Sequence, residues 1–286
     1  MNETEIIQSS FVFDKVIQVE YRGNVNGIQL YSGYCDQEWR IRKVMHGGYL
    51  LSMILNAFTH HFRNVHPHPI QISAHFLNTS IVGPCEIEIQ DIKAGKTQSV
   101  AYAILKQKNG NLMEESIEKI HATVIFGDLN KEKGISQPYY DVIPLPKKSD
   151  CELFELDPTL LFMHDHLKIL LDTQNKNSNR AERKHWIKFN DERQLDIISL
   201  GAFCDFIFPA TTNYLERSLG ECWHPTLTLE IQFKNLPKGQ WVAGSFRSRF
   251  LRNGRNEVDG ELWDESGNLL CITRHMCLIT PIKTNL

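Results

Sequence analysis

The feature that most constrains this 286-residue chain is that its sequence repeats itself once. Two pairs of similar segments carry the repeat: HPIQISAHFLN (68–78) with HPTLTLEIQFKN (224–235), and QKNGNL (107–112) with DESGNL (264–269). Both pairs are offset by the same distance, since Phe233 follows Phe76 by 157 positions and Gly267 follows Gly110 by 157. A repeat of this kind means that one supersecondary unit occurs twice. We therefore expect two halves with the same order of elements.

Each half has the pattern of an antiparallel sheet. The segment CEIEIQDI (85–92) alternates apolar and polar residues, as a strand with one buried face does. The turns KNGN (108–111) and ESGN (265–268) are short and contain glycine, as hairpins require. These patterns predict half-buried antiparallel strands in both halves.

Each half also has one apolar helical segment before its strands. The first is HGGYLLSMILNAFTHHF (46–62), in which Leu51, Leu55, Phe58 and Phe62 recur at helical spacing. The second is IISLGAFCDFIFPATTNYL (197–215), where Pro209 should stop or kink the helix. We expect an α+β fold in which two long helices are each wrapped by a curved antiparallel sheet, and the two sheets could join edge to edge.

The same patterns divide the chain into three parts. Residues 1–128 form the expected N-terminal domain, residues 191–286 the C-terminal domain, and residues 129–190 a linker. The linker contains Pro138, Pro144 and Pro146, a helical candidate around 158–171, and the polar stretch TQNKNSNRAERK (173–184), for which we expect a mobile loop.

Composition excludes several classes of function. The formal net charge is −3, so there is no net basic field for a nucleic-acid partner. Seven cysteines without a C-x-x-C pair, and a first segment unlike a signal peptide, favour a reducing, cytoplasmic location. No apolar run approaches the roughly 20 residues of a membrane span. The last residues, Thr-Asn-Leu, do not support a peroxisomal address. No motif indicates a metal site or a cofactor.

Several strings resemble the thioesterase-like superfamily, and in particular the acyl-CoA thioesterase II enzymes. They are MHGGYLLSMIL in the first half, and HWIKFNDERQLDIISLGAFCDF, PTLTLEIQFKN and GELWDESGNLLCITRH in the second. The resemblance extends from about Trp39 to Ile279. It implies a double hot-dog, the covalent version of a hot-dog homodimer, and an acyl-CoA or related acyl thioester as substrate. A homo-oligomer is possible, because exposed sheet edges can pair.

The resemblance also implies a catalytic site in the second half. In thioesterase II enzymes an Asp, a Thr and a Gln hold and activate the hydrolytic water. The Asp falls on Asp205 and the Thr on Thr226, whereas the Gln position is occupied by His275. This chain therefore departs from the family pattern at the third position.

The residues themselves leave two interpretations open at each position. Asp205 is the one charged residue in 197–215; burial would raise its pKa and suit it to act as a general base, or it could simply cap the helix. Thr226 could hold the water or be an ordinary strand threonine. His275 could orient the water, act as a second base, or be a structural hydrogen-bonding residue.

A second group of candidates precedes the first helix. His46, Gly47 and Gly48 stand where a helix N-terminus would expose N–H groups to the developing oxyanion of a thioester. Alternatively, the two glycines only allow close packing and a sharp turn. We assign these three residues to substrate binding.

Two main hypotheses follow from the sequence. The first is hydrolysis of acyl-CoA or related thioesters by a water activated at Asp205, Thr226 and His275. The second is a non-catalytic protein that binds acyl-CoA or a hydrophobic ligand on the same scaffold. A hydratase is less favoured, because the Asp-x-x-x-x-His pattern is absent at Asp205, where position 210 is alanine.

Overall fold

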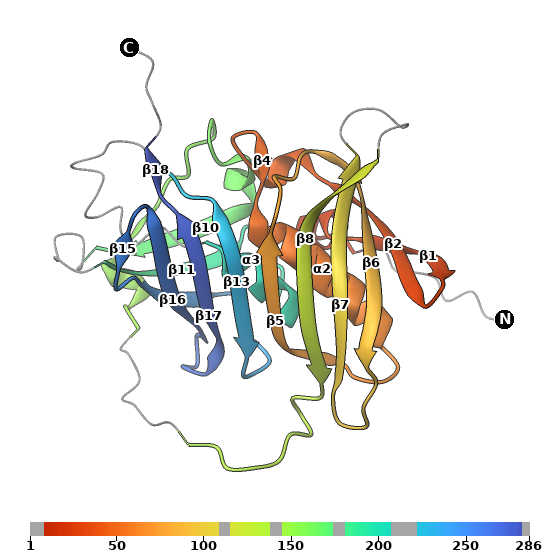
Figure 1. Cartoon of the computed structure of the whole chain (residues 1–286). Coiled ribbons are helices and arrows are strands. Elements are labelled where there is room, and N and C mark those ends of the chain that lie inside the picture. Colours follow the sequence, from red (N-terminus) through yellow and green to blue (C-terminus); the bar gives the residue numbers. More distant parts are fainter. Residues whose placement is uncertain (1–8, 109–114, 138–144, 174–180, 207–221, 282–286) are drawn as a thin grey trace.

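One antiparallel sheet dominates the part of the chain that the structure describes. The structure is a computed structural model, and it describes residues 9–108, 115–137, 145–173, 181–206 and 222–281. The sheet has 14 strands, in the order β1-β2-β6-β7-β8-β5-β13-β17-β16-β14-β11-β10-β9, with β15 paired to β16. Figure 1 shows the strands side by side, with helix α2 lying behind those of the N-terminal half.

The two halves of the repeat supply the two halves of the sheet. The N-terminal strands are, in sheet order, β1 (Val19–Val25), β2 (Ile28–Cys35), β6 (Gly83–Lys93), β7 (Ser99–Lys108), β8 (Ser116–Gly127) and β5 (His68–Phe76). The C-terminal strands are β13 (Thr226–Phe233), β17 (Leu269–Leu278), β16 (Arg255–Asp264), β15 (Leu251–Arg252), β14 (Val242–Arg247), β11 (Glu182–Phe189), β10 (Leu167–Asp172) and β9 (Cys151–Leu153). Short elements complete the structure: α1 (Val12–Val16), the pairs β3 (Arg40–Ile41) with β4 (Val44–Met45) and β12 (Cys222–Trp223) with β18 (Thr280–Pro281), and 3-10 turns at Gln37–Trp39, Lys148–Asp150 and Phe162–His166.

The halves meet where strand β5 pairs with strand β13. In this pairing Ser73 lies opposite Glu230, and these two positions are themselves 157 residues apart. A residue that pairs with its own counterpart marks a local two-fold relation between the repeats. The expected joining of the two sheets edge to edge is therefore confirmed.

Helix α2 (Gly47–Phe62) forms as the apolar pattern predicts. His46 caps it, because its Nδ1 accepts a hydrogen bond from the Tyr49 N–H at 3.1 Å. The helix is buried along most of its length, and Leu51, Ile54 and Phe58 are fully buried between helix and sheet. A helix apolar on nearly every face is stable only when other elements enclose it.

The second helix is much shorter than predicted. Helix α3 spans Ile197–Phe203, whereas the predicted helical segment ran from 197 to 215 with a stop or kink at Pro209; residues 207–215 lie outside the described residues. After Phe203 the hydrogen bonding changes from the α-helical to the 3-10 pattern. The Asp205 N–H donates to the Ala202 carbonyl, three residues earlier. The prediction of two long helices is wrong for the part of this segment that the structure describes.

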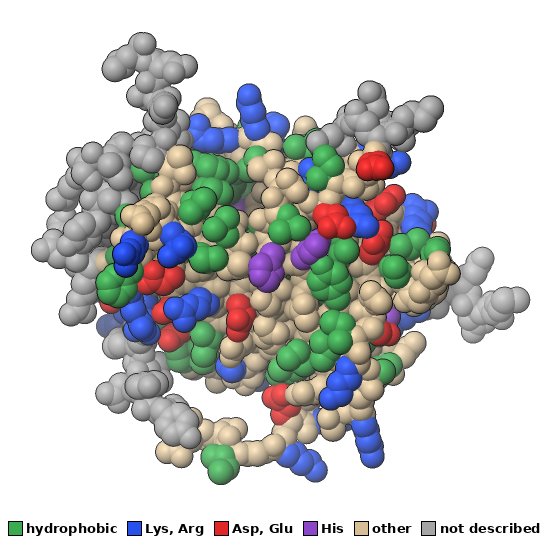
Figure 2. Space-filling model, in the orientation of Figure 1, with side chains coloured by type: hydrophobic (Ala, Val, Ile, Leu, Met, Phe, Trp, Pro, Cys, Tyr) green, Lys and Arg blue, Asp and Glu red, His purple; other side chains and the backbone are tan. Residues whose placement is uncertain are grey.

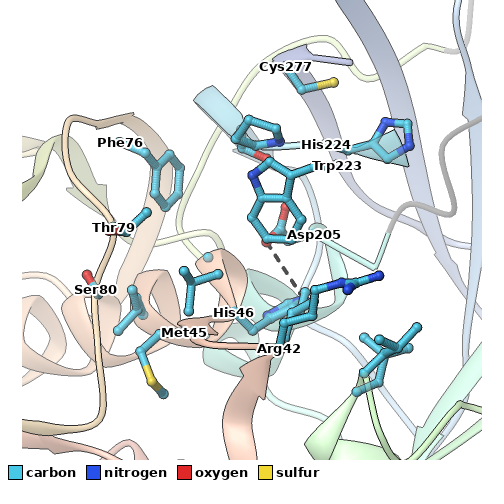
Figure 3. A pocket seen from close by; sticks show the side chains of 18 of the residues that line it. Arg42, Met45, His46, Phe76, Thr79, Ser80, Asp205, Trp223, His224 and Cys277 are labelled. Carbon is cyan, nitrogen blue, oxygen red and sulfur yellow. Dashed lines mark ion pairs between the residues drawn. The ribbon is translucent and has the colours of Figure 1, made fainter. Parts of the chain in front are cut away.

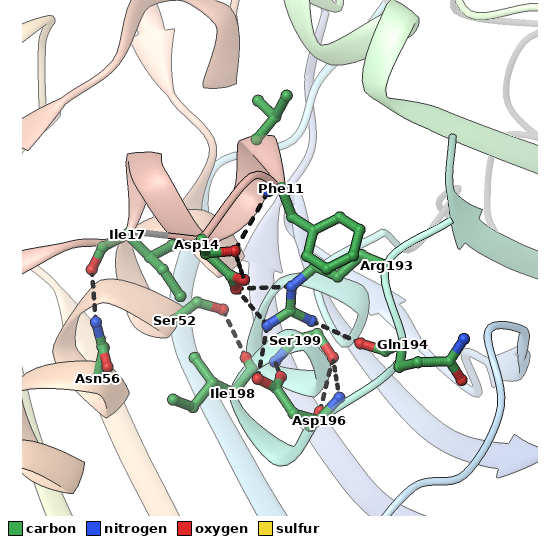
Figure 4. Close-up of polar contacts among 12 residues, drawn as sticks. Phe11, Asp14, Ile17, Ser52, Asn56, Arg193, Gln194, Asp196, Ile198 and Ser199 are labelled. Atoms are coloured by element: carbon green, nitrogen blue, oxygen red, sulfur yellow. Dashed lines mark hydrogen bonds and ion pairs between the residues drawn. The ribbon is translucent and has the colours of Figure 1, made fainter. Parts of the chain in front are cut away.

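A partly buried ion cluster lies at the start of α3 (Figure 4). Asp196 and Ser199 form a reciprocal capping box. Arg193, which is buried, holds Asp14 and Asp196 at 2.6 Å each. This cluster ties helix α1 to α3, and so sets the position of Asp205 at the far end of α3.

The segment predicted as a linker contributes to the sheet. Within residues 129–190, strands β9, β10 and β11 extend the sheet beyond β14. The helical candidate at 158–171 is a 3-10 turn, Phe162–His166, followed by β10, whose alternating burial is that of a strand. Of the polar stretch expected to be a mobile loop, residues 174–180 lie outside the described residues, and Glu182 already begins β11. The prolines suggested a linker, yet the described part of this segment supplies three strands of the sheet.

The two predicted hairpin turns differ in outcome. The turn at 265–268 is confirmed: Gly267 has φ +80° and its N–H donates to the Asp264 carbonyl at 3.0 Å. The turn at 108–111 lies almost wholly outside the described residues. Among the helices that are described, none has the length and apolar character needed to cross a membrane.

Candidate functional site

A cavity of about 870 Å³ lies between the two halves. Its lining is mostly apolar, and it combines the β3–β4 hairpin and the start of α2 with residues from the second half. The lining residues used below are Arg42, His46, Gly47, Phe76, Glu155, Asp157, Asp205, Trp223, His224, Thr226 and Cys277. Figure 3 shows Asp205 inside the cavity next to His46, with Phe76 and Trp223 near it. A mostly apolar cavity with few polar groups is the usual form of a small-molecule site.

Asp205 is a buried acidic group in the lining of this cavity. Its side chain is 10% exposed, and its two oxygens contact groups from both halves. Oδ2 accepts a hydrogen bond from the Gly48 N–H at 2.7 Å and lies 3.7 Å from His46 Nε2. Oδ1 lies 3.2 Å from His275 Nε2. The segment after helix α3 therefore places a carboxylate that is largely buried but still reaches the cavity.

The pKa of Asp205 does not shift in the expected direction. Burial by itself would raise this pKa, as the sequence suggested. The hydrogen bond from His275, the neighbouring imidazoles of His46 and His275, and the Gly48 N–H together outweigh burial, so the pKa lies below its ordinary value. Asp205 is consequently ionised at neutral pH.

His46 is a neutral, fixed neighbour of that carboxylate. Because Nδ1 accepts from the Tyr49 N–H, the ring proton of the neutral form sits on Nε2, which faces Asp205. Burial lowers the pKa of His46 in spite of the opposing effect of Asp205. The ring also stacks on Phe206 with centroids 4.4 Å apart. His46 can thus donate a hydrogen bond toward the cavity but cannot rotate freely.

The two glycines next to His46 have different environments. The N–H of Gly48 is already used by Asp205. A Cβ at Gly48 would lie 2.7 Å from the Ala202 carbonyl oxygen, so this position supports the packing interpretation. Gly47 lines the cavity, and a Cβ there would lie 2.9 Å from Asp205 Oδ2. Of the two glycines, Gly47 is the one beside the space where a substrate carbonyl could bind.

His275 and Thr226 differ in their relation to Asp205, because His275 contacts it and Thr226 shares only the cavity with it. The His275 side chain is fully buried on β17, does not line the cavity, and its Nδ1 has no hydrogen-bond partner among the described residues. Thr226 begins β13 and does line the cavity. No hydrogen bond between described residues joins Thr226 to Asp205 or His275. Asp205, His46, Gly48 and His275 therefore form one contact group, and Thr226 shares only the cavity with it.

Three lining residues had no signal in the sequence. Arg42 adopts φ +54° at the tip of the β3–β4 hairpin and donates its N–H to the Leu160 carbonyl at 2.7 Å. Trp223 and Cys277 reach the cavity from β12 and β17. Burial raises the pKa of Cys277 to about 11, so it is a thiol at neutral pH. Tertiary contacts bring Arg42, Trp223 and Cys277 to one cavity, and their spacing in the sequence does not indicate this proximity. The described residues include no cluster of His, Cys, Asp or Glu able to hold a metal ion.

Comparison with known proteins matches both halves of the chain to domains of the same family. Residues 35–127 match the family model of the acyl-CoA thioesterase N-terminal domain, and residues 151–279 that of the C-terminal domain. A thioesterase-like protein, TwmA, from Talaromyces wortmannii is 23% identical and covers 97% of this chain and 94% of its own length.

Two solved structures show the fold. A hot-dog protein of unknown function from Alicyclobacillus acidocaldarius superposes with a TM-score of 0.81 at 19% identity, covering 97% of this chain and all of that one. An acyl-CoA thioesterase II from Mycobacterium marinum gives a TM-score of 0.73 at 13% identity, with 95% and 99% coverage. The chain has the hot-dog fold and belongs to the acyl-CoA thioesterase family.

Proposed function

We propose that this protein is a double hot-dog enzyme that hydrolyses acyl-CoA or related acyl thioesters, with Asp205 as the general base. Family membership supports thioester hydrolysis in general. The observation that carries the site assignment is that Asp205 is an ionised carboxylate, 10% exposed, in the lining of a mostly apolar cavity. An apolar cavity suits an acyl chain, and a base in its wall suits attack on the bond that links the chain to sulfur.

The proposed reaction needs only water and substrate. Asp205 removes a proton from a water molecule while the water oxygen bonds to the thioester carbonyl carbon. The resulting oxyanion accepts a hydrogen bond from the Gly47 N–H at the start of α2. When the intermediate collapses the carbon–sulfur bond breaks, the thiolate leaves, and the proton held by Asp205 returns to sulfur. A thiol has a pKa of about 8.5, so the thiolate is a good leaving group.

His275 is proposed to act through Asp205. It is fully buried and separated from the cavity, so orienting the water directly is the least suitable of its three predicted roles. Its bond to Oδ1 at 3.2 Å holds the carboxylate in one orientation, as the Gly48 N–H does for Oδ2. His46 directs its Nε2 toward the same carboxylate, and Thr226 is left to hold the water or the substrate from the cavity wall.

The alternative, a non-catalytic binder of acyl-CoA or another hydrophobic ligand, is favoured by one observation. The lowered pKa of Asp205 makes it a weaker base than a carboxylate in an apolar pocket would be. A third possibility, hydration of an enoyl thioester, has no supporting residue at position 210.

One experiment separates these functions. Purified protein is mixed with acyl-CoAs of increasing chain length, free thiol is followed with a chromogenic reagent, and thermal stability is recorded with the same compounds. Thiol release above the uncatalysed rate supports hydrolysis. Stabilisation by ligand without thiol release would contradict hydrolysis and favour the binder. An enoyl-CoA is tested in the same way, and loss of its enoyl chromophore without thiol release would favour hydration.

The remaining predictions concern the protein as a whole. The division at residues 128 and 190, the cytoplasmic location and the homo-oligomer stay predictions. We propose moving the boundary of the second domain to the start of β9 at Cys151, because β9, β10 and β11 belong to its half of the sheet. Limited proteolysis between Gly127 and Cys151 that leaves two stable fragments would support this boundary.

A further inference from the structure

The charges around the cavity do not by themselves stabilise an anionic intermediate. Figure 2 shows basic and acidic side chains interspersed over the visible face of the molecule. In the described part of the cavity lining, the charged groups besides Asp205 are Arg42, Glu155 and Asp157, which is one cation against two further carboxylates. In the proposed reaction, attack by water moves negative charge from Asp205 to the carbonyl oxygen. Stabilisation of that oxygen therefore depends on hydrogen-bond donors close to it.

The imidazole of His46 offers such a donor in the cavity wall (Figure 3). Its Nδ1 accepts the Tyr49 N–H at 3.1 Å, so the proton of the neutral ring is on Nε2. Nε2 lies 3.7 Å from Asp205 Oδ2, which is longer than a hydrogen bond. No hydrogen bond between described residues uses the Nε2 proton. His46 therefore presents a donor beside the carboxylate that a ligand can use.

The His46 ring is held in one orientation. It caps α2 through Nδ1, stacks on Phe206 with centroids 4.4 Å apart, and belongs to a residue that is 2% exposed. A donor that is fixed before the substrate binds needs no reorganisation when charge develops. His46 also precedes Gly47, where a Cβ would lie 2.9 Å from Asp205 Oδ2. The ring and the Gly47 N–H thus border the same carboxylate from the start of one helix.

His46 donates as a neutral group. Burial lowers its pKa, and the nearby imidazole of His275 acts in the same direction, although Asp205 opposes both. A neutral imidazole keeps its N–H for the substrate, whereas an imidazolium would form an ion pair with Asp205. Such an ion pair would make Asp205 a weaker base toward water. The neutral state of His46 is therefore compatible with both steps of the reaction.

The two imidazoles beside Asp205 differ in what they can contact. His275 Nε2 lies 3.2 Å from Oδ1, and the His275 side chain is fully buried and does not line the cavity. His46 is further from the carboxylate, and it does line the cavity. His275 therefore positions the carboxylate, whereas His46 can contact a carbonyl group placed next to it.

We propose that His46 is a catalytic residue whose Nε2–H, together with the Gly47 N–H, hydrogen-bonds the thioester carbonyl oxygen. This proposal deepens the proposed hydrolysis and rests on it. As the water oxygen bonds to the carbonyl carbon, the π electrons of the C=O bond move to its oxygen, and both donors bind the oxyanion more strongly than the carbonyl. The Nε2 proton is not transferred. Asp205 remains the group that takes the proton from water and returns it to sulfur.

The first test compares His46→Asn with wild type and with the control His60→Asn, at an exposed position near the other end of α2. Asparagine at position 46 still caps the helix, but its shorter side chain cannot place a donor where Nε2 lies. We expect kcat for acyl-CoA hydrolysis to fall about 10²- to 10³-fold with little change in KM. The control should match wild type. Thermal melts verify that each variant is folded.

The second test uses two inhibitors that separate an oxyanion contact from a structural role. The first is an acyl-CoA analogue with a methylene between the carbonyl and sulfur, and the second is its α,α-difluoro counterpart, whose ketone adds water to form a tetrahedral hydrate. His46→Asn should weaken binding of the difluoro compound at least about tenfold more than binding of the simple ketone. Equal weakening of both compounds would overturn the proposed contact.

The outcomes also separate this proposal from the proposed function. Unchanged kcat in His46→Asn, in an enzyme that Asp205→Asn inactivates, would reject the role of His46 and leave the hydrolysis standing. A wild-type protein that releases no thiol from any acyl-CoA would reject the hydrolysis and the role of His46 together.

Discussion

The two halves of the repeat differ most in their helices. Helix α2 has 16 residues, is buried almost throughout, and carries no acidic side chain. Helix α3 has seven residues, and Asp205 lies two positions after its last residue. The helices cross in contact, since Ser52 donates to the Ile198 carbonyl at 2.9 Å and Gly48 to Asp205 at 2.7 Å. In the proposed mechanism one copy of the unit supplies contacts that hold Asp205 and the other supplies Asp205 itself, so neither half contains the whole candidate site.

The largest expected effect comes from removing the charge that only the second half carries. Asp205→Asn keeps an oxygen to accept the Gly48 N–H but cannot take a proton from water. We expect kcat for acyl-CoA hydrolysis to fall about 10²- to 10⁴-fold. The matched control, Asp91→Asn, alters an exposed carboxylate of the first half and should leave kcat unchanged. Equal rates for wild type and Asp205→Asn would remove Asp205 from the mechanism.

A second prediction concerns pH and the C-terminal half alone. His185 is fully buried on β11, and burial, with Arg183 nearby, lowers its pKa to about 4 from an ordinary 6.5. In the unfolded chain His185 binds a proton more readily than in the folded protein. The free energy of unfolding therefore has its full value above pH 6.5 and falls as the pH drops toward 4. The loss should be about 3 kcal/mol from this residue.

The measurement is chemical denaturation at several pH values. His185→Leu should flatten the dependence between pH 6.5 and 4, whereas His75→Leu, at an exposed position of the first half, should not. The same slope in wild type and His185→Leu would show that another group causes the acid sensitivity.

A third prediction compares the two glycines at the start of α2. Alanine at Gly48 would meet backbone oxygens of Gly201 and Ala202 at 2.8 and 2.7 Å, whereas alanine at Gly47 would meet side-chain atoms of Asp205 and Phe76. Helix propensity favours alanine over glycine to a similar extent at both positions. A difference in the free energy of unfolding between the two variants therefore reports on the contact between helices α2 and α3. We expect Gly48→Ala to lower the free energy of unfolding by about 2 kcal/mol. Gly47→Ala should cost less stability but reduce kcat, and equal stability of the two variants would contradict this contact.

The smallest effect is expected where this chain departs from its family. An amide at position 275 can still donate a hydrogen bond to Asp205 Oδ1, so His275→Gln should keep kcat within about tenfold of wild type, roughly the contribution of one hydrogen bond. His275→Leu, which removes the donor, should lose more. A Gln variant as slow as the Leu variant would show that the imidazole itself is required.

Much of the architecture could be predicted because the relevant information is local. The 157-residue repeat gave two equivalent halves, and the helical spacing of Leu51, Leu55 and Phe58 gave α2. Predictions failed where a local signal was overridden by tertiary context. The apolar run after Phe203 looks helical, yet α3 ends there, and the prolines near β9 and β10 suggested a linker where the sheet continues.

Two of the predicted residues, Asp205 and His275, lie in contact, but the direction of the Asp205 pKa shift was not predictable. Asp205 is conspicuous as a lone acid in an apolar segment, and burial alone would raise its pKa. The direction reverses because Gly48 and His46 come from the other half and His275 from a strand 70 residues away. Nothing in the spacing of these residues indicates that they contact one carboxylate.

The most direct test of the account is a crystal structure with a non-hydrolysable acyl-CoA analogue, in which a methylene separates the carbonyl from sulfur. We predict that its carbonyl carbon lies beside Asp205, its oxygen faces the Gly47 N–H, and its acyl chain fills the cavity between the two halves. An analogue bound elsewhere, or an Asp205 carboxylate directed away from the carbonyl, would contradict the proposed site.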